Sequence, residues 1–214
     1  MRTLHMLLSI GVLANLVLSS GCQPANAPPA KSANVESAKV KSEKGVPTSK
    51  AESPAKPAIE VAAEVRDWAG VEAWIAEQKG RVVVVDVWST SCDPCLAEFS
   101  NFVALHKQYG KDVACASVNV DYYAAQKDPP PALQERVKKT LVRLAASMQN
   151  FIASDRDEDV FQVIEVAAIP TVLVYDREGK LHKKFSNDNQ EFGERGFTYR
   201  DHIVPAVKEL IATP

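Results

Sequence analysis

The feature that most constrains this sequence is a pair of cysteines, Cys92 and Cys95, that stands between an apolar run and a helical pattern. The run over 82–87 consists almost entirely of valine, which is typical of a central strand buried on both faces. The segment 96–109 carries apolar residues at helical spacing. Because the unpaired N–H groups of a helix N-terminus favour a thiolate, the first cysteine is expected to be the reactive one. A dithiol at a strand-to-helix turn indicates redox chemistry in which the pair closes into a disulfide.

Beyond residue 60 the sequence alternates between strand and helix patterns. Helices are predicted from Trp68 toward a stop at Gly80, over 133–148 and 157–166, and after Thr198, and strands are predicted over 113–120, 150–153, 171–175 and 180–185. The prolines at 129–131 are expected to exclude regular structure. Pro205 lies inside the last helical pattern, so this helix is expected either to kink or to begin again at Pro205 as its first residue.

Three separated parts of the sequence resemble the thioredoxin superfamily. The segment Trp88-Ser-Thr-Ser-Cys92-Asp-Pro-Cys95 is similar to the family motif Trp-x-x-x-Cys-x-Pro-Cys. Asp86 lies six residues before the first cysteine, as the buried acid of thioredoxins does, and Ile169-Pro170-Thr171 resembles the start of the family's cis-proline strand. The resemblance covers about residues 61–214. It implies a thioredoxin-like α/β fold with a mixed central sheet flanked by helices.

Within the superfamily, the sequence is most similar to the membrane-anchored TlpA/ResA-type oxidoreductases. A helix and a strand are predicted between Val120 and Asp157, where minimal thioredoxins have no such insert. Two positions of the cysteine motif differ from thioredoxins proper, because Ser91 stands in place of a second Trp and Asp93 in place of Gly.

The resemblance implies a role for each residue near the cysteines. Cys92 is the expected nucleophile, whose thiolate attacks a partner's disulfide, and Cys95 is expected to resolve the resulting mixed disulfide. Asp86 is the expected proton relay for Cys95, because burial raises the pKa of a carboxyl group. The alternative for Asp86 is a buried carboxyl that is merely satisfied by hydrogen bonds. Trp88 is expected to pack beside the disulfide, or else to be an ordinary core residue.

Three further residues are expected to shape the cysteine site. The charge of Asp93 disfavours a thiolate at Cys92 and therefore favours the disulfide, which predicts a more reducing couple. Pro94 restricts the start of the helix. Pro170 is expected to form a cis peptide bond and to face the cysteines, flanked by Ile169 and Thr171; a trans proline at the start of a strand is the alternative.

The N-terminal part of the sequence predicts export. Residues 1–21 combine a basic residue, an apolar stretch and small residues, as in a secretory signal peptide. The cysteine that follows, Cys22, resembles the lipidated cysteine of a bacterial lipobox; a plain signal peptide or an uncleaved anchor is the alternative. Residues 22–59 are rich in Pro, Ala, Ser and Lys, which predicts a disordered tether. Residues 60–214 are expected to form the folded domain.

A partner site is predicted at the sheet edge that carries the cysteines. The strands at 82–87 and 113–120 are expected to be parallel neighbours, so that their carboxyl ends open on one edge, where ligands bind in open α/β sheets. Tyr122 and Tyr123 leave the second strand at that edge. By analogy with the family, Phe197 ends a loop that borders the same groove. We expect these aromatic side chains to shape the partner site, with ordinary core or surface positions as the alternative.

Other chemistries fit the cysteine pair less well. A fixed structural disulfide needs no such flanking motif, and a zinc site requires two further ligands, for which the scattered histidines offer no paired spacing. Copper proteins of the Sco type carry a cysteine spacing one residue longer. Cys115 lies inside a predicted strand and is expected to be a small core residue. We therefore expect no metal, and no cofactor besides the Cys92–Cys95 disulfide.

The sequence thus predicts a thiol–disulfide oxidoreductase of the cell envelope that faces the periplasm and is held to a membrane by a lipid. The expected partners are disulfide-containing exported proteins, such as apocytochromes c, and a membrane electron donor. A net charge of −2 gives no sign of nucleic-acid binding, and a monomer is expected. Two alternatives stay open: a disulfide oxidant or isomerase, and a non-catalytic adaptor or redox sensor with the same fold.

Overall fold

The computed structural model describes residues 61–123, 129–188 and 190–213. In chain order their elements are β1 (Glu64–Arg66), α1 (Trp68–Glu77), β2 (Val82–Trp88), α2 (Asp93–Tyr109), β3 (Val113–Asn119), α3 (Pro131–Arg143), β4 (Gln149–Ala153), α4 (Asp157–Ile164), β5 (Thr171–Tyr175), β6 (Leu181–Ser186), a π-helical turn η1 (Tyr199–Ile203) and α5 (Val204–Ala212).

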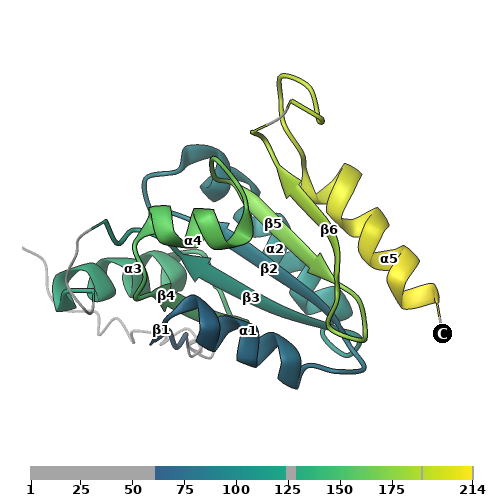
Figure 1. Ribbon diagram of the computed structural model, residues 1–214, viewed down its shortest axis with the longest axis horizontal. Coiled ribbons are helices and arrows are strands. Elements are labelled where there is room, and N and C mark those ends of the chain that lie inside the picture. Colours follow the sequence, from purple (N-terminus) through teal and green to yellow (C-terminus); the bar gives the residue numbers. More distant parts are fainter. Residues whose placement is uncertain (1–60, 124–128, 189, 214) are drawn as a thin grey trace, which may run out of the picture. The chain divides into compact units, whose positions relative to one another are not determined.

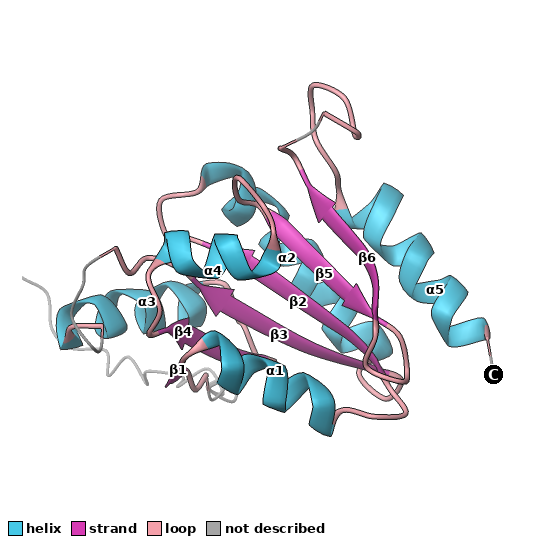
Figure 2. Cartoon of the chain, viewed as in Figure 1, coloured by secondary structure: helices cyan, strands magenta, loops and turns pink. Residues whose placement is uncertain are grey.

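The strands form one mixed sheet with the order β1-β4-β3-β2-β5-β6 (Figure 2). The pairs β1–β4, β4–β3 and β3–β2 are parallel, whereas β2–β5 and β5–β6 are antiparallel. Helices cover both faces of this sheet (Figure 1). The predicted thioredoxin-like α/β fold is therefore confirmed, together with the parallel pairing of β2 and β3.

The central strand β2 separates two apolar clusters. Val83, Val85 and Val87 pack in the cluster that includes α1 and α4, while Val84 and Trp88 pack in the cluster that includes α2, α3 and α5. This division follows from strand geometry, because successive side chains point to opposite faces of a sheet. Asp86 shares the alternation of Val84 and Trp88. Its carboxyl group is thereby directed toward the face covered by α2 and η1.

The insert between β3 and α4 contains the predicted helix and strand, but the helix is shorter than expected and begins earlier. It runs from Pro131 to Arg143 instead of over 133–148. The expectation that the prolines exclude regular structure was wrong at Pro131. A proline in the first helical turn loses no hydrogen bond, since the N–H groups there have no partner within the helix. The chain leaves the helix at Ala145, whose φ is +54°.

The short edge strand β1 was not predicted. It has three residues and pairs only with β4. Asn150 fixes the backbone that leads into it, because its side chain donates to the carbonyl of Ala62 at 3.0 Å. This pairing depends on a contact between distant segments, so no local pattern indicates it.

The C-terminal helix follows the second of the two alternatives for Pro205. Thr198 caps η1, since its hydroxyl accepts from the N–H of Asp201 at 3.1 Å. A regular helix then begins at Val204, one residue before the proline. Pro205 lies in the first turn of this helix, where its missing N–H has no consequence.

The predicted signal peptide 1–21, the lipidated Cys22 and the tether 22–59 lie outside the described residues. Among the helices that are described, none has both the length and the apolar character needed to cross a bilayer.

Candidate active site

Cys92 and Cys95 form a disulfide at the start of α2. Cys92 is the N-cap of the helix, and its sulfur accepts a hydrogen bond from the N–H of Cys95 at 3.3 Å. Cys92 is half-buried, whereas Cys95 is 3% exposed. The two sulfurs are therefore unequal: a partner can reach Cys92, while Cys95 is held inside the protein. Asp93 and Pro94 occupy the first turn, where Asp93 is exposed.

The Ile169–Pro170 peptide bond is cis, as the resemblance implied. It immediately precedes β5, whose first residue, Thr171, pairs with Val87 near the end of β2. Thr171 is fully buried, and its hydroxyl donates to the carbonyl of Ala168 at 2.8 Å. Thr171 therefore supports the turn, whereas the half-buried Ile169 lies beside Cys92 at the surface.

Asp86 lies behind the disulfide and is 4% exposed. The hydroxyl of Tyr199 donates a hydrogen bond to Oδ2 of Asp86. Burial raises the pKa of Asp86 to about 7; the Tyr199 hydrogen bond opposes this shift, and the negative charge of Glu98 adds to it. A carboxyl group with this pKa can exchange a proton near neutral pH. This is the property that a proton relay to Cys95 requires.

Trp88 packs in the apolar cluster that contains Cys95. It is fully buried and makes an edge-to-face contact with Phe99 of α2, with ring centroids 5.2 Å apart. Trp88 therefore anchors the beginning of the cysteine helix to the end of β2.

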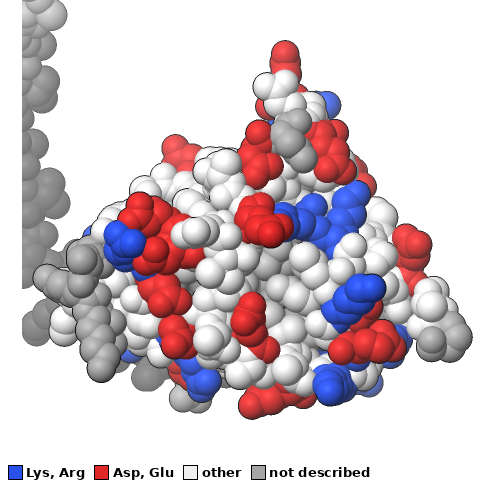
Figure 3. Space-filling view, in the orientation of Figure 1, with Lys and Arg blue, Asp and Glu red and all other residues white. Residues whose placement is uncertain are grey.

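Cys92 opens on a groove of about 480 Å³ at the carboxyl edge of the sheet. Its apolar part comes from the segment after β3, from α4 and from the cis-proline turn, and its polar part includes two carboxyl groups. Besides Cys92 and Pro94, the lining residues are Ser89, Ser91, Asp93, Val120, Tyr123, Asp157, Phe161 and Ile169. Acidic side chains gather over α4 in Figure 3, where Asp157, Glu158 and Asp159 form its first turn.

The three aromatic residues predicted at the partner site have different positions. Tyr123 is 60% exposed and lines the groove. Tyr122 is 2% exposed and belongs to the core, which is the alternative that the sequence left open for this residue. Phe197 is also buried, and it lines a second cavity rather than the groove.

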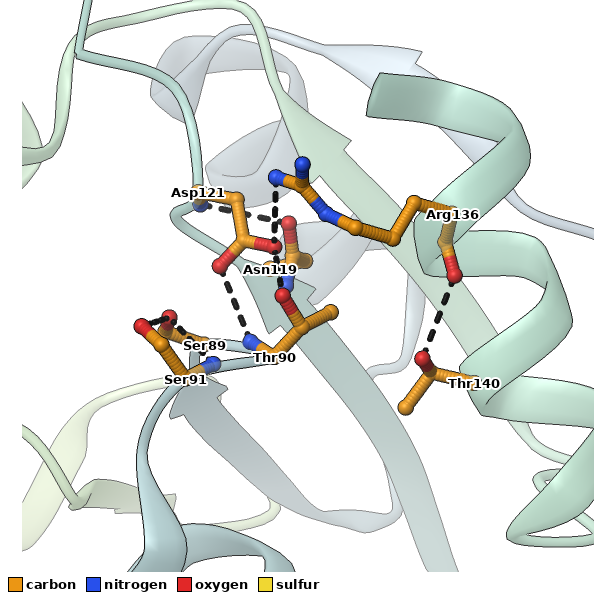
Figure 4. A network of polar contacts seen from close by, with 7 residues as sticks. All are labelled: Ser89, Thr90, Ser91, Asn119, Asp121, Arg136 and Thr140. Atoms are coloured by element: carbon orange, nitrogen blue, oxygen red, sulfur yellow. Dashed lines mark hydrogen bonds and ion pairs between the residues drawn. The ribbon is translucent and has the colours of Figure 1, made fainter. Parts of the chain in front are cut away.

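A buried carboxylate, Asp121, holds the loop that leads into the cysteines (Figure 4). Its Oδ1 accepts from the N–H of Thr90 at 2.9 Å, and its Oδ2 accepts from the hydroxyl of Thr90. Arg136 of α3 lies 3.5 Å from the same Oδ2. Within this loop, the hydroxyls of Ser89 and Ser91 are 2.9 Å apart. The insert helix, the end of β3 and the cysteine loop thus share one polar network.

Two residues of the site, Tyr199 and Asp121, were not predicted from the sequence. Tyr199 is separated from Asp86 by 113 positions, and no sequence pattern joins them. The place of Asp121 could have been predicted from the sequence, because a polar residue directly after a buried parallel strand lies at the ligand-binding edge of the sheet. The same reasoning from topology would have placed it beside the loop before Cys92.

In the part of the chain that the structure describes, no cluster of His, Cys, Asp and Glu side chains is arranged to hold a metal ion. Cys115 is buried and unbonded, and burial raises the pKa of its thiol. The thiolate form that reactivity requires is therefore suppressed at Cys115.

A protein-family model described as Redoxin matches residues 54–197. Comparison with curated proteins finds no match. Among solved structures, the chain is similar to an exposed lipoprotein thioredoxin of Streptococcus pneumoniae, with 24% identity, coverage of 64% of this chain and 90% of the other, and a TM-score of 0.47. It is also similar to a secreted Mycobacterium tuberculosis disulfide oxidoreductase homologous to E. coli DsbE, with 16% identity, coverage of 63% and 86%, and a TM-score of 0.47. A thioredoxin-like protein from Porphyromonas gingivalis shows 18% identity, coverage of 62% and 76%, and a TM-score of 0.46.

The raised pKa of Asp86 predicts a pH-dependent cost in stability. The folded state keeps the proton of Asp86 up to about pH 7, while the unfolded chain releases it near 3.8, so the free energy of unfolding falls as pH rises through this window. The shift corresponds to roughly 4 kcal/mol at pH 8. We expect Asp86→Asn to gain stability relative to the wild type by up to about this amount between pH 4 and pH 8. Urea unfolding of the oxidised protein measures the difference, with Asp93→Asn as the exposed control; a difference that stays constant with pH would contradict the expectation.

The network around Asp121 predicts a local loss of order in Asp121→Asn. The amide puts an NH2 group in place of Oδ2, so the acceptor for the Thr90 hydroxyl and the ion pair with Arg136 are lost, and the remaining oxygen offers the N–H of Thr90 an uncharged and therefore weaker acceptor. We expect a loss of about 1–3 kcal/mol in unfolding free energy and faster hydrogen exchange at the Thr90 amide. Arg136→Gln is the matched control, because it removes only a partly exposed ion pair that contributes less than about 1 kcal/mol. Unchanged exchange at Thr90 in Asp121→Asn would exclude this holding role.

Proposed function

This chain belongs to the Redoxin family, and we propose that it is an extracytoplasmic thiol–disulfide oxidoreductase that reduces disulfides in exported proteins. The pairing of an accessible Cys92 with a buried Cys95 at a helix N-terminus carries the enzymatic part of this proposal. Such a pair supplies two electrons and closes into a disulfide in return. The cis-Pro170 turn and the groove beside Cys92 give a polypeptide partner a place to dock.

The reaction follows from the unequal positions of the two sulfurs. In the reduced protein, the Cys92 thiolate attacks one sulfur of the partner's disulfide, which forms a mixed disulfide and releases one partner thiolate. Cys95 then transfers its proton to the carboxylate of Asp86. The resulting Cys95 thiolate attacks the sulfur of Cys92, which forms the Cys92–Cys95 disulfide and releases the second partner thiolate. The partner gains two electrons and the dithiol loses two.

The direction of electron flow is supported by Asp93. Its carboxylate lies next to Cys92 at the start of α2, where a negative charge disfavours the thiolate and so favours the oxidised pair. Because Asp93 is exposed, solvent and salt reduce this effect. A disulfide oxidant or isomerase would use the same residues with electrons flowing in the other direction.

Location and partners rest on the sequence of the first 59 residues. A signal peptide over 1–21, a lipidated Cys22 and a tether of polar composition would hold the domain near a membrane surface. A membrane electron donor would then return electrons to the oxidised pair, and apocytochromes c are one class of exported protein that requires reduced cysteines. The disulfide itself serves as the redox centre, and the enzyme is proposed to work as a monomer without a metal.

Loss of the resolving cysteine should trap the partner on Cys92. Cys95→Ser leaves the nucleophile but removes the resolving thiol, so mixed disulfides with envelope proteins should accumulate several-fold over the wild type. Non-reducing electrophoresis and mass spectrometry of cells that express the full chain measure these adducts. Cys92→Ser and Cys115→Ser in a Cys95→Ser background separate the roles: the first should abolish the adducts, and the second should leave them unchanged. If Cys95→Ser traps nothing, the adaptor alternative replaces the enzyme.

The reduction potential of the Cys92–Cys95 pair determines the direction of electron flow. Equilibration of the full chain with thiol–disulfide buffers should give a reduction potential near ~−270 mV, as for thioredoxin. Asp93→Asn should move the potential toward less reducing values, because it removes the charge that disfavours the thiolate. A value near ~−120 mV, as for the strong oxidant DsbA, would overturn the reductase and make the protein a donor of disulfides.

A further inference from the structure

A second cavity lies beside Cys95 of the disulfide and is distinct from the groove that opens at Cys92. It measures about 160 Å³, and its lining includes Asp86, Cys95, Glu98, Thr198 and Tyr199. Among the described residues, only Pro94 lines both this cavity and the groove. The buried sulfur and the buried carboxyl group therefore share a space that is distinct from the groove at Cys92, with Pro170 of the cis-proline turn also in its wall.

Only one of the two oxygens of the Asp86 carboxyl group has a hydrogen-bond partner among the described residues. The hydroxyl of Tyr199 donates to Oδ2, whereas Oδ1 has no hydrogen-bond partner among the described residues although it is fully buried. Buried polar atoms in proteins nearly always have a partner, so an orphaned oxygen at a functional site requires an explanation. Because Asp86 lines the same cavity as Cys95, this unpartnered oxygen leaves its carboxyl group free to accept a proton there.

Tyr199 is held in place from three sides. Its N–H donates to Oε2 of Glu98 at 2.9 Å, and Glu98 lies one helical turn after Cys95 in α2. Its ring packs on Phe102 of the same helix, with centroids 5.4 Å apart. Thr198, the preceding residue, caps the π-helical turn. The orientation of the hydroxyl toward Asp86 is therefore determined by the cysteine helix itself.

The loop that precedes Tyr199 is also held by close contacts. Asn187 accepts from the N–H of Phe197 at 3.0 Å. Gly196 has a φ of +70°, and a Cβ at this position would lie 2.4 Å from the side-chain nitrogen of Asn187. Only glycine allows the loop to approach Asn187, the residue after β6, this closely. The contact fixes the chain two residues before Thr198.

We propose that Tyr199 and Glu98 are positioning residues that tune Asp86 as the proton acceptor for Cys95, and that the cavity behind the disulfide is the path by which this proton reaches solvent. The inference rests on the proposed thiol–disulfide exchange. In the resolving step, the S–H bond of Cys95 breaks and an O–H bond forms on Asp86. The proton then leaves through the cavity, while the partner's thiolate leaves through the groove. The two products therefore depart through different openings.

The two positioning residues act on Asp86 with opposite signs. Other groups facing Asp86 are Cys95 on α2, Cys115 on β3, and Arg195, which lines the cavity from the loop before Tyr199. The hydrogen bond from Tyr199 stabilises the carboxylate and lowers the pKa of Asp86, whereas the charge of Glu98 raises it. Removal of the Tyr199 hydroxyl should therefore raise the pKa of Asp86, and neutralisation of Glu98 should lower it.

The test is a titration of the Asp86 carboxyl by carbon NMR in the oxidised full chain, with Asp86→Asn to assign the signal. Tyr199→Phe should raise the midpoint by about one pH unit, because a hydrogen bond to a charged group is lost. Glu98→Gln keeps an oxygen that can accept from Tyr199 but removes the charge, so the midpoint should fall. Tyr175→Phe is the matched control: it removes another largely buried tyrosine hydroxyl, on β5 and outside both cavities, and should leave the midpoint unchanged.

A kinetic experiment on the same variants connects the titration to the reaction. The reduced full chain is mixed with a peptide disulfide, and the rate of mixed-disulfide resolution is followed from pH 5 to pH 9. At pH 7, Tyr199→Phe should resolve about fivefold more slowly than the wild type, with its half-maximal rate at a higher pH, while Glu98→Gln should shift the profile to a lower pH. Tyr175→Phe should follow the wild-type profile.

The outcomes separate this inference from the proposed function. If the wild type resolves peptide disulfides but Tyr199→Phe and Glu98→Gln leave both the midpoint and the pH profile unchanged, the positioning roles are excluded and the oxidoreductase stands. If the wild type does not react with disulfides, the proposed function fails, while opposite NMR shifts in the two variants would still establish how Asp86 is tuned. Shifts of the same sign would overturn the inference.

Discussion

The burial of β2 on both faces is the constraint on which the rest of the structure depends. Each of its seven residues is buried, and it pairs in parallel with β3 and antiparallel with β5. The first pairing brings Asp121 to the edge where the cysteine loop begins, and the second brings the cis-Pro170 turn there. Alternation along the same strand directs Asp86 toward α2. The redox site is thus a consequence of how one strand is covered.

A charged residue inside such a strand is costly, and the structure compensates only part of that cost. Tyr199 satisfies one oxygen of Asp86, while the other oxygen has no partner among the described residues. A fully satisfied carboxylate would have an ordinary or lowered pKa and would hold its charge at neutral pH. Burial, opposed only in part by the Tyr199 hydrogen bond, instead keeps the pKa of Asp86 near the pH at which a proton must be exchanged. Stability is therefore lost at the position where the chemistry requires a weak acid, as is common at active sites.

The sequence predicted those parts of the site that depend on local patterns. The valines before Cys92, the helix after it and the motif around Pro170 all act over a few residues, so the fold and the reactive sulfurs followed from them. Tyr122 was assigned to the partner site because the sequence predicted where β3 ends. It did not predict in which direction each side chain after the strand points. Tyr199 is a partner of Asp86 only through the packing of the C-terminal turn on α2. Side-chain pairs of this kind depend on tertiary geometry, which one sequence does not encode in any local spacing.

The cysteine helix separates two steps of thiol–disulfide exchange: the exchange of sulfur bonds with the partner at Cys92 and the transfer of the Cys95 proton to Asp86. Cys92 caps the helix and faces the groove, whereas Cys95, one turn further, faces the second cavity with Asp86. A protein partner that covers the groove also excludes water from Cys92, and without another route the proton of Cys95 would be enclosed with it. Because the second cavity shares only Pro94 with the groove among the described residues, a partner seated in the groove leaves the proton a separate way out. Glu98 and Phe102 of the same helix hold Tyr199, so any movement of α2 on docking would also change the environment of Asp86.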